Sequence, residues 1–108
     1  MIKHVTAETF KQEVLESKVP VLVDFWATWC GPCRMQGQIL ESLDKKMDET
    51  NTSSTAVLAK VNVDEQQELA MQFGVMSIPT LIVFKDGKAV AKEVGVRNED
   101  QLQRMLMN

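Results

Sequence analysis

The two cysteines of the chain, Cys30 and Cys33, are separated only by Gly31 and Pro32. Such a pair can close a small disulfide ring when the second cysteine lies in the first turn of a helix. The first cysteine then lies at the helix N-terminus, where unpaired N–H groups and the helix dipole favour an anion. We expect the pKa of Cys30 to fall below the free value of about 8.5. Because the thiolate is the attacking species, the spacing indicates thiol–disulfide exchange.

The residues around the pair fit this interpretation. Pro32 suits an early helical position, where its missing N–H group costs nothing. Gly31 has no side chain, so a substrate disulfide can approach closely. Trp29 directly precedes Cys30, and we expect it to form an apolar wall beside the nucleophile.

Other interpretations of the pair are weaker. A structural disulfide of such short span would constrain the unfolded chain little, because loop-closure entropy grows with loop length. A structural zinc site needs four ligands, and the chain offers two cysteines and the distant His4, so a second chain would be required. The remaining alternatives are an inert pair, a metal or iron–sulfur carrier built from two chains, and a non-redox binding subunit or scaffold.

The apolar pattern predicts the elements that hold the cysteines. Residues 21–27 form a near-continuous apolar run, typical of a strand buried on both faces, and Asp24 interrupts it. A helix is expected to follow the cysteines to about Asp48, because apolar residues recur every four positions. These residues are Met35, Ile39, Leu43 and Met47.

Local signals predict where other elements begin and end. Thr6 is the expected N-cap of a first helix that ends near Ser17. Gly74 is expected to end a later helix. Asp86-Gly87 lies between two apolar runs, which predicts a type I′ hairpin turn. Asn98 is the expected cap of the last helix.

The expected fold class is α/β, with a central mixed five-stranded sheet flanked by four helices. The order of elements is β-α-β-α-β-α-β-β-α, with the parallel strands first and an antiparallel hairpin last. The expected strands cover residues 2–5, 21–27, 56–63, 80–84 and 89–94, and a polar loop covers residues 48–55.

Length and composition narrow the classes of function. The 108 residues are expected to form a single domain, 1–108. The net charge of −3 and the lack of a basic stripe argue against nucleic-acid binding. No apolar stretch approaches the roughly 20 residues that span a bilayer. Residues 1–5 lack the apolar core of a signal peptide, which favours a cytoplasmic location.

Six stretches occur in a characteristic order over nearly the whole chain: Val23-Asp24-Phe25-Trp26-Ala27, Trp29-Cys30-Gly31-Pro32-Cys33, Lys60-Val61-Asn62-Val63-Asp64, Ile78-Pro79-Thr80-Leu81, Phe84-Lys85-Asp86-Gly87 and Val94-Gly95. Together they resemble the thioredoxin family. The Gly-Pro insert between the cysteines is similar to that of the family's reducing members.

The resemblance implies roles for individual residues. Cys30 corresponds to the attacking nucleophile and Cys33 to the resolving cysteine. Asp24 corresponds to a buried proton acceptor whose charge Lys60 modulates, and Pro79 to a cis-proline that faces the cysteines. The implied substrate-binding surface consists of Trp29, Gly31, Pro32, Ile78, Val94, Gly95 and Val96.

The resemblance also implies the partners. The Cys30–Cys33 disulfide would be the redox group, with no bound cofactor and no metal. A flavoprotein thioredoxin reductase would restore the dithiol at the expense of NADPH, and the substrates would be disulfide-containing proteins. The chain would act as a monomer. It lacks the GxGxxG fingerprint of a dinucleotide site of its own.

The chain departs from the family pattern at three places. Gly37-Gln38 stands where the family usually has a helix-kinking proline, so we expect a straighter helix or a bend at Gly37. The polar loop at residues 48–55 is longer than usual. Val96 stands where the family often has alanine, which is expected to alter the fit to partners.

Overall fold

The computed structural model describes residues 1–107, which include a five-stranded mixed sheet. The strands are β1 (Ile2–His4), β2 (Val21–Trp26), β3 (Val57–Asn62), β4 (Thr80–Lys85) and β5 (Lys88–Val94). Their order across the sheet is β1-β3-β2-β4-β5. β1, β3 and β2 are parallel, whereas β4 is antiparallel to both β2 and β5. The mixed sheet predicted from the sequence is therefore confirmed.

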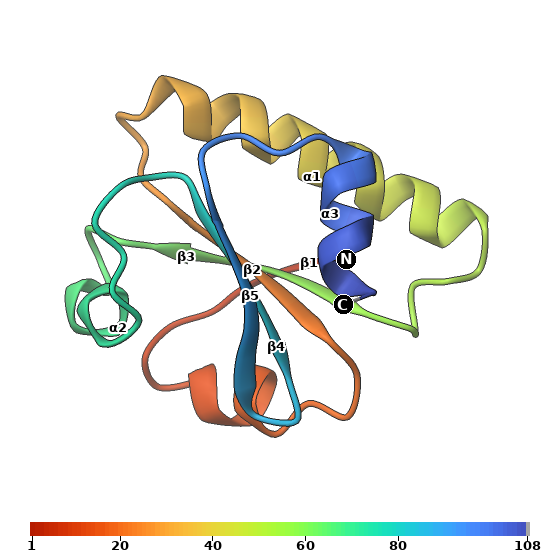
Figure 1. Ribbon diagram of the computed structural model, residues 1–108, viewed down its shortest axis with the longest axis horizontal. Coiled ribbons are helices and arrows are strands. Elements are labelled where there is room, and N and C mark those ends of the chain that lie inside the picture. The colour runs from red at the N-terminus through yellow and green to blue at the C-terminus, as the bar shows by residue number, and fades with distance from the viewer. Residues whose placement is uncertain (108) are drawn as a thin grey trace.

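Helical segments cover both faces of this sheet. They are η1 (Lys11–Leu15), α1 (Gly31–Glu49), α2 (Gln67–Gln72) and α3 (Glu99–Leu106). α1 and α3 lie on one face, and η1 and α2 lie on the other (Figure 1). The order of strands and helices along the chain agrees with the predicted order.

The central strand β2 is buried on both faces, as its apolar run predicts. Val21, Val23 and Phe25 belong to the core beneath η1 and α2, whereas Leu22 belongs to the core beneath α1 and α3. Successive side chains of a strand point to opposite faces. The carboxyl group of Asp24 therefore lies on the side of the sheet that α1 covers.

Three predicted boundary signals are confirmed. Asp86 and Gly87 both have positive φ angles, 51° and 78°, as a type I′ turn requires. Gly74, with φ 65°, follows the end of α2. Asn98 caps α3: its side chain accepts from the Gln101 N–H, and the Asn98 N–H donates to the side-chain oxygen of Gln101.

The first helix differs from its prediction. Thr6 does not cap it, because the Thr6 hydroxyl lies 3.4 Å from the Thr9 hydroxyl and accepts from no main-chain N–H group within residues 1–107. The Thr6 N–H donates to Thr9 Oγ1 at 3.0 Å, and a turn forms over residues 6–9. η1 begins at Lys11 without a side-chain cap, and the Glu16 N–H reaches back five residues to the Lys11 carbonyl. Threonine hydroxyls compete with the helix for nearby N–H groups, which explains the later start.

Helix α1 runs unbroken for 19 residues, through Gly37 and Gln38, and ends at Glu49. The apolar stripe predicted for it is partly wrong, since Met35 is 58% exposed. A helix completes a turn in 3.6 residues, so a strict interval of four drifts off the buried face. The buried residues instead alternate intervals of three and four: Cys33, Gln36, Leu40, Leu43 and Met47.

Candidate active site

Cys30 and Cys33 form a disulfide at the start of α1, and their Cα atoms are 5.2 Å apart. Cys30 is the N-cap residue, and Pro32 lies in the first positions of the helix. The Cys33 main-chain N–H donates to Cys30 Sγ at 3.2 Å. A sulfur at this position therefore faces the unpaired donors of a helix N-terminus, which favour negative charge.

The loop before β4 lies against the disulfide. The Ile78–Pro79 peptide bond is cis, and Ile78 O is 3.9 Å from Cys30 Sγ. The Gly95 N–H donates to Pro79 O at 2.8 Å, which brings the segment after β5 to the same edge of the sheet. Ile78, Pro79 and Gly95 thus lie near the cysteines.

Trp29 stands out from the surface beside Cys30. It is 68% exposed, and its indole N–H donates to the Asp64 carboxylate at 2.8 Å. Gly31, Pro32 and Val94 are exposed as well. A hollow of about 150 Å³ adjoins this region and is lined by Trp29, Val63, Val75, Met76, Ser77 and Ile78.

Asp24 is a fully buried carboxyl group on β2. Neither of its oxygens has a hydrogen-bond partner. Burial raises the pKa of Asp24 to about 7, and the positive charge of Lys60 acts in the opposite direction. A carboxyl group with such a pKa can accept and release a proton near neutral pH.

Lys60 lies opposite Asp24 in the register between β2 and β3. Its ammonium group lies 4.3 Å from the centroid of the Trp26 ring, a cation–π contact. The same nitrogen would be 3.4 Å from a Cβ atom added at Gly37. Gly37 therefore leaves space on α1 where the lysine side chain ends.

Sequence reasoning missed two residues at this site. Asp64 holds the Trp29 indole, and Gln36 is fully buried on α1. A glutamine three residues after Cys33, followed by apolar residues at the helical spacing, could have signalled a buried amide. Asp64 ends a stretch that resembles the family, but no local pattern gave it a role, because its contact with Trp29 spans 35 residues.

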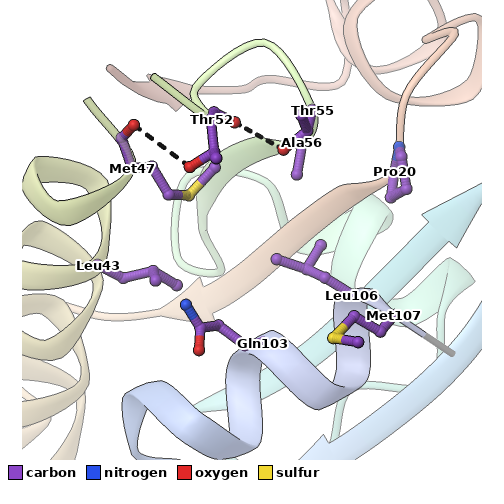
Figure 2. A pocket seen from close by; sticks show the side chains of 9 residues that line it. All are labelled: Pro20, Leu43, Met47, Thr52, Thr55, Ala56, Gln103, Leu106 and Met107. Carbon is purple, nitrogen blue, oxygen red and sulfur yellow. Dashed lines mark hydrogen bonds between the residues drawn. The ribbon is translucent and has the colours of Figure 1, made fainter. Parts of the chain in front are cut away.

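A second hollow, of about 440 Å³, lies where α1 ends and β2 begins, at the other end of both elements from the cysteines. Figure 2 shows the side chains that line it. None of its lining residues is an acid, a base or a cysteine, so it offers no group for thiol–disulfide exchange. The lining residues are Pro20, Leu43, Met47, Thr52, Thr55, Ala56, Gln103, Leu106 and Met107.

Two further findings concern the described residues as a set. Within residues 1–107, no three His, Cys, Asp or Glu side chains lie close enough together to hold a metal ion. None of the helices in this part of the chain is long and apolar enough to cross a membrane.

An open mixed sheet with a Cys-x-x-Cys disulfide at the start of the helix after its central strand defines a thiol–disulfide oxidoreductase. The comparisons with known proteins agree. The thioredoxin family model matches residues 1–108. The chain therefore belongs to the thioredoxin family, whose members exchange dithiols with protein disulfides.

Individual relatives cover most of the chain. Thioredoxin 1 of Synechococcus elongatus is 52% identical over 91 residues, which are 84% of this chain and 80% of the relative. Thioredoxin 1 of Nostoc sp. is 46% identical over 94% of this chain and 91% of its own length. Thioredoxin of Rickettsia bellii is 40% identical over 100% of this chain and 98% of its own length.

Proposed function

We propose that the chain reduces disulfides of target proteins and that the Cys30 thiolate begins each cycle. The observation that carries this proposal is the hydrogen bond from the Cys33 N–H to Cys30 Sγ at the N-terminus of α1. The donor and the helix dipole favour a negative charge on that sulfur. Cys30 is also the less buried of the two, with 5% of its surface exposed against 2% for Cys33.

The exchange takes place in two steps. Cys30 Sγ attacks one sulfur of the target disulfide, that bond breaks, and the other target sulfur leaves as a thiolate and takes up a proton. Cys33 then loses its proton and attacks Cys30 Sγ, which releases the second target thiol and restores the Cys30–Cys33 disulfide. The target gains two electrons from the chain and two protons from its surroundings: Cys33 gives up one proton during the cycle, and Cys30 gave up the other when its thiolate formed.

Asp24 is the proposed acceptor of the Cys33 proton, directly or through water. Its support is the pKa of about 7 that burial gives this carboxyl group. A base with a pKa near the working pH combines a useful ionised fraction with a sufficient affinity for the proton. Lys60 modulates this group through its positive charge.

The target is proposed to bind as an extended segment beside Pro79. The contact between Ile78 O and Cys30 Sγ supports this placement, because strand-like pairing with the Ile78 main chain would bring a target disulfide to the nucleophile. The flanking residues of this docking surface are Trp29, Gly31, Pro32, Val94, Gly95 and Val96.

The oxidised chain must be reduced again from outside. Membership of the thioredoxin family supports a flavoprotein thioredoxin reductase that uses NADPH, so that the chain itself binds no cofactor. We place this cycle in the cytoplasm, with the chain acting as a monomeric single domain.

A trapping experiment tests the order of the two cysteines. Cys33→Ser should accumulate mixed disulfides with insulin, because the second step is blocked, whereas Cys30→Ser should form none. The unsubstituted protein should catalyse insulin reduction by dithiothreitol. Absence of a mixed disulfide with Cys33→Ser, or equal trapping by both variants, would rule out the proposed sequence of steps.

A further inference from the structure

Gln36 makes an unusual connection from the cysteine-bearing helix. Its side chain is fully buried on α1, three residues after Cys33. Its Nε2 donates to the Arg97 carbonyl at 3.0 Å, and its Oε1 accepts from the Arg97 N–H at 2.7 Å. A buried amide is costly unless it is paired, and here donor and acceptor are both paired with one residue. Two hydrogen bonds therefore join α1 to the loop between β5 and α3, which lies 61 positions further along the sequence.

Arg97 directly follows Val94–Val96, the part of the proposed docking surface at the end of β5. These three residues are called the docking loop below. Its guanidinium donates to Val96 O at 3.1 Å and pairs with Glu93 at 3.0 Å. Within the docking loop, the Gly95 N–H donates to Pro79 O. The docking loop is thus fixed to the cis-proline at one point and to α1, through Gln36, at another.

We propose that Gln36 is a positioning residue that fixes the position of the docking loop relative to the disulfide. This inference rests on the proposed function, because it assumes that targets contact Val94–Val96 while Cys30 attacks. Gln36 has no hydrogen bond to either sulfur. Its loss should therefore change how a protein target is held and leave the chemistry of exchange as it is.

Loss of this positioning should affect the reduction of a protein disulfide and of a small disulfide differently. A protein disulfide in an extended segment must contact the loop and Ile78 at the same time, so a displaced loop weakens its binding. A small aromatic disulfide needs access only to Cys30 Sγ. A residue that served stability alone would not distinguish the two substrates, because both react with the same folded chain.

The variant Gln36→Met tests the proposal, because methionine has a similar length and removes both hydrogen bonds. Gln38→Met is the matched control, since Gln38 is exposed on the same helix. Reduced protein, freed of dithiothreitol, is mixed with increasing insulin or with 5,5′-dithiobis(2-nitrobenzoate) in single-turnover experiments. Circular dichroism identifies a temperature at which all the proteins are folded.

For Gln36→Met we expect the half-saturating insulin concentration to rise about five-fold or more, since small misplacements of a bound group have large effects. The limiting rate and the rate with the small disulfide should match those of the parent and of Gln38→Met. An unchanged half-saturating concentration, or an equal loss with both substrates, would overturn the positioning role. A parent chain that reduces neither substrate would instead overturn the proposed function and the inference with it.

A second variant and a second measurement cover the case in which Gln36→Met does not fold. Gln36→Leu also removes both hydrogen bonds and adds no buried charge, and the same rise in half-saturation is expected. Hydrogen exchange of the Arg97 amide in the unsubstituted protein needs no variant. Slow exchange would support its hydrogen bond to Gln36, and exchange as fast as in an unstructured peptide would overturn it.

Discussion

Asp24 and Lys60 stand in register on neighbouring strands, yet each side chain has a different environment. Lys60 Nζ lies over the Trp26 ring, and neither Asp24 oxygen has a hydrogen-bond partner. The lysine therefore acts on the carboxyl group through its charge and is held in place by the aromatic ring. This arrangement lowers the cost of ionising Asp24 without abolishing it, and the pKa stays raised, at about 7.

Replacing Asp24 with asparagine should stabilise the oxidised protein in a pH-dependent way. The pKa of Asp24 is about 7 in the folded state against an ordinary 3.8. As pH rises between these values, the unfolded chain ionises first and the parent loses stability, and above about pH 7 the loss is complete. We expect Asp24→Asn to gain up to about 4 kcal/mol over the parent at alkaline pH, relative to its difference from the parent at acid pH.

Urea unfolding from about pH 4 to about pH 8 measures this difference. The exposed variant Asp48→Asn is the control and should show no comparable gain. A stability difference between parent and Asp24→Asn that stays constant with pH would contradict the raised pKa.

Removing the charge of Lys60 should extend to higher pH the range over which ionisation of Asp24 destabilises the protein. Lys60 lowers the pKa of Asp24, so Lys60→Met should raise that pKa further above 7. The fall in stability with pH should then continue to a higher pH than in the parent. Titration of the Asp24 carboxyl group by NMR gives the value directly, and Lys45→Met, at an exposed position of α1, should leave it unchanged.

Gly37→Ala should stabilise the protein by about 1 kcal/mol, because glycine inside a helix costs this much relative to alanine. The added methyl group would meet only the end of the flexible Lys60 side chain, at 3.4 Å. Thermal unfolding measures the effect. Gly95→Ala is the contrasting variant, since Gly95 has φ 96° and alanine there is strained. A destabilised Gly37→Ala would show that Lys60 cannot shift.

Asn98→Ala should destabilise the protein by about 1 kcal/mol through loss of the helix cap. Asn98 Oδ1 accepts from the Gln101 N–H at 2.9 Å, and the Gln101 side chain accepts from the Asn98 N–H at 2.8 Å. Chemical denaturation gives the change. Asn98→Asp, which keeps an acceptor at the cap, should retain most of the stability, and an equal loss in both variants would argue against capping.

The parts of the fold that the sequence predicted well depend on local chemistry. Asp86-Gly87 specifies its turn because few residues adopt positive φ, and Asn98 specifies a helix start because its side chain accepts a main-chain hydrogen bond. The place of Cys30 at a helix N-terminus follows from Pro32 in the same way. Each signal acts within a few residues, so a single sequence reveals it.

What the sequence could not predict depends on contacts between distant segments. Gln36 meets Arg97, and Trp29 meets Asp64, only after the sheet has formed. The position of Lys60 over Trp26 rather than against Asp24 is likewise set by packing beneath α1. Thr6 failed as a cap because two local hydrogen-bonding patterns compete there, and propensity alone does not choose between them.

The length of α1 has a practical consequence for handling the protein. Its 19 residues separate the disulfide from the segment 50–55 by about 28 Å, at 1.5 Å per residue. Every residue of that segment is exposed, and it lies at the opposite end of α1 in Figure 1. A fluorescent dye or a solid support attached at Ser53 would leave the surface around Cys30 uncovered, so immobilised chains should still meet bulky substrates.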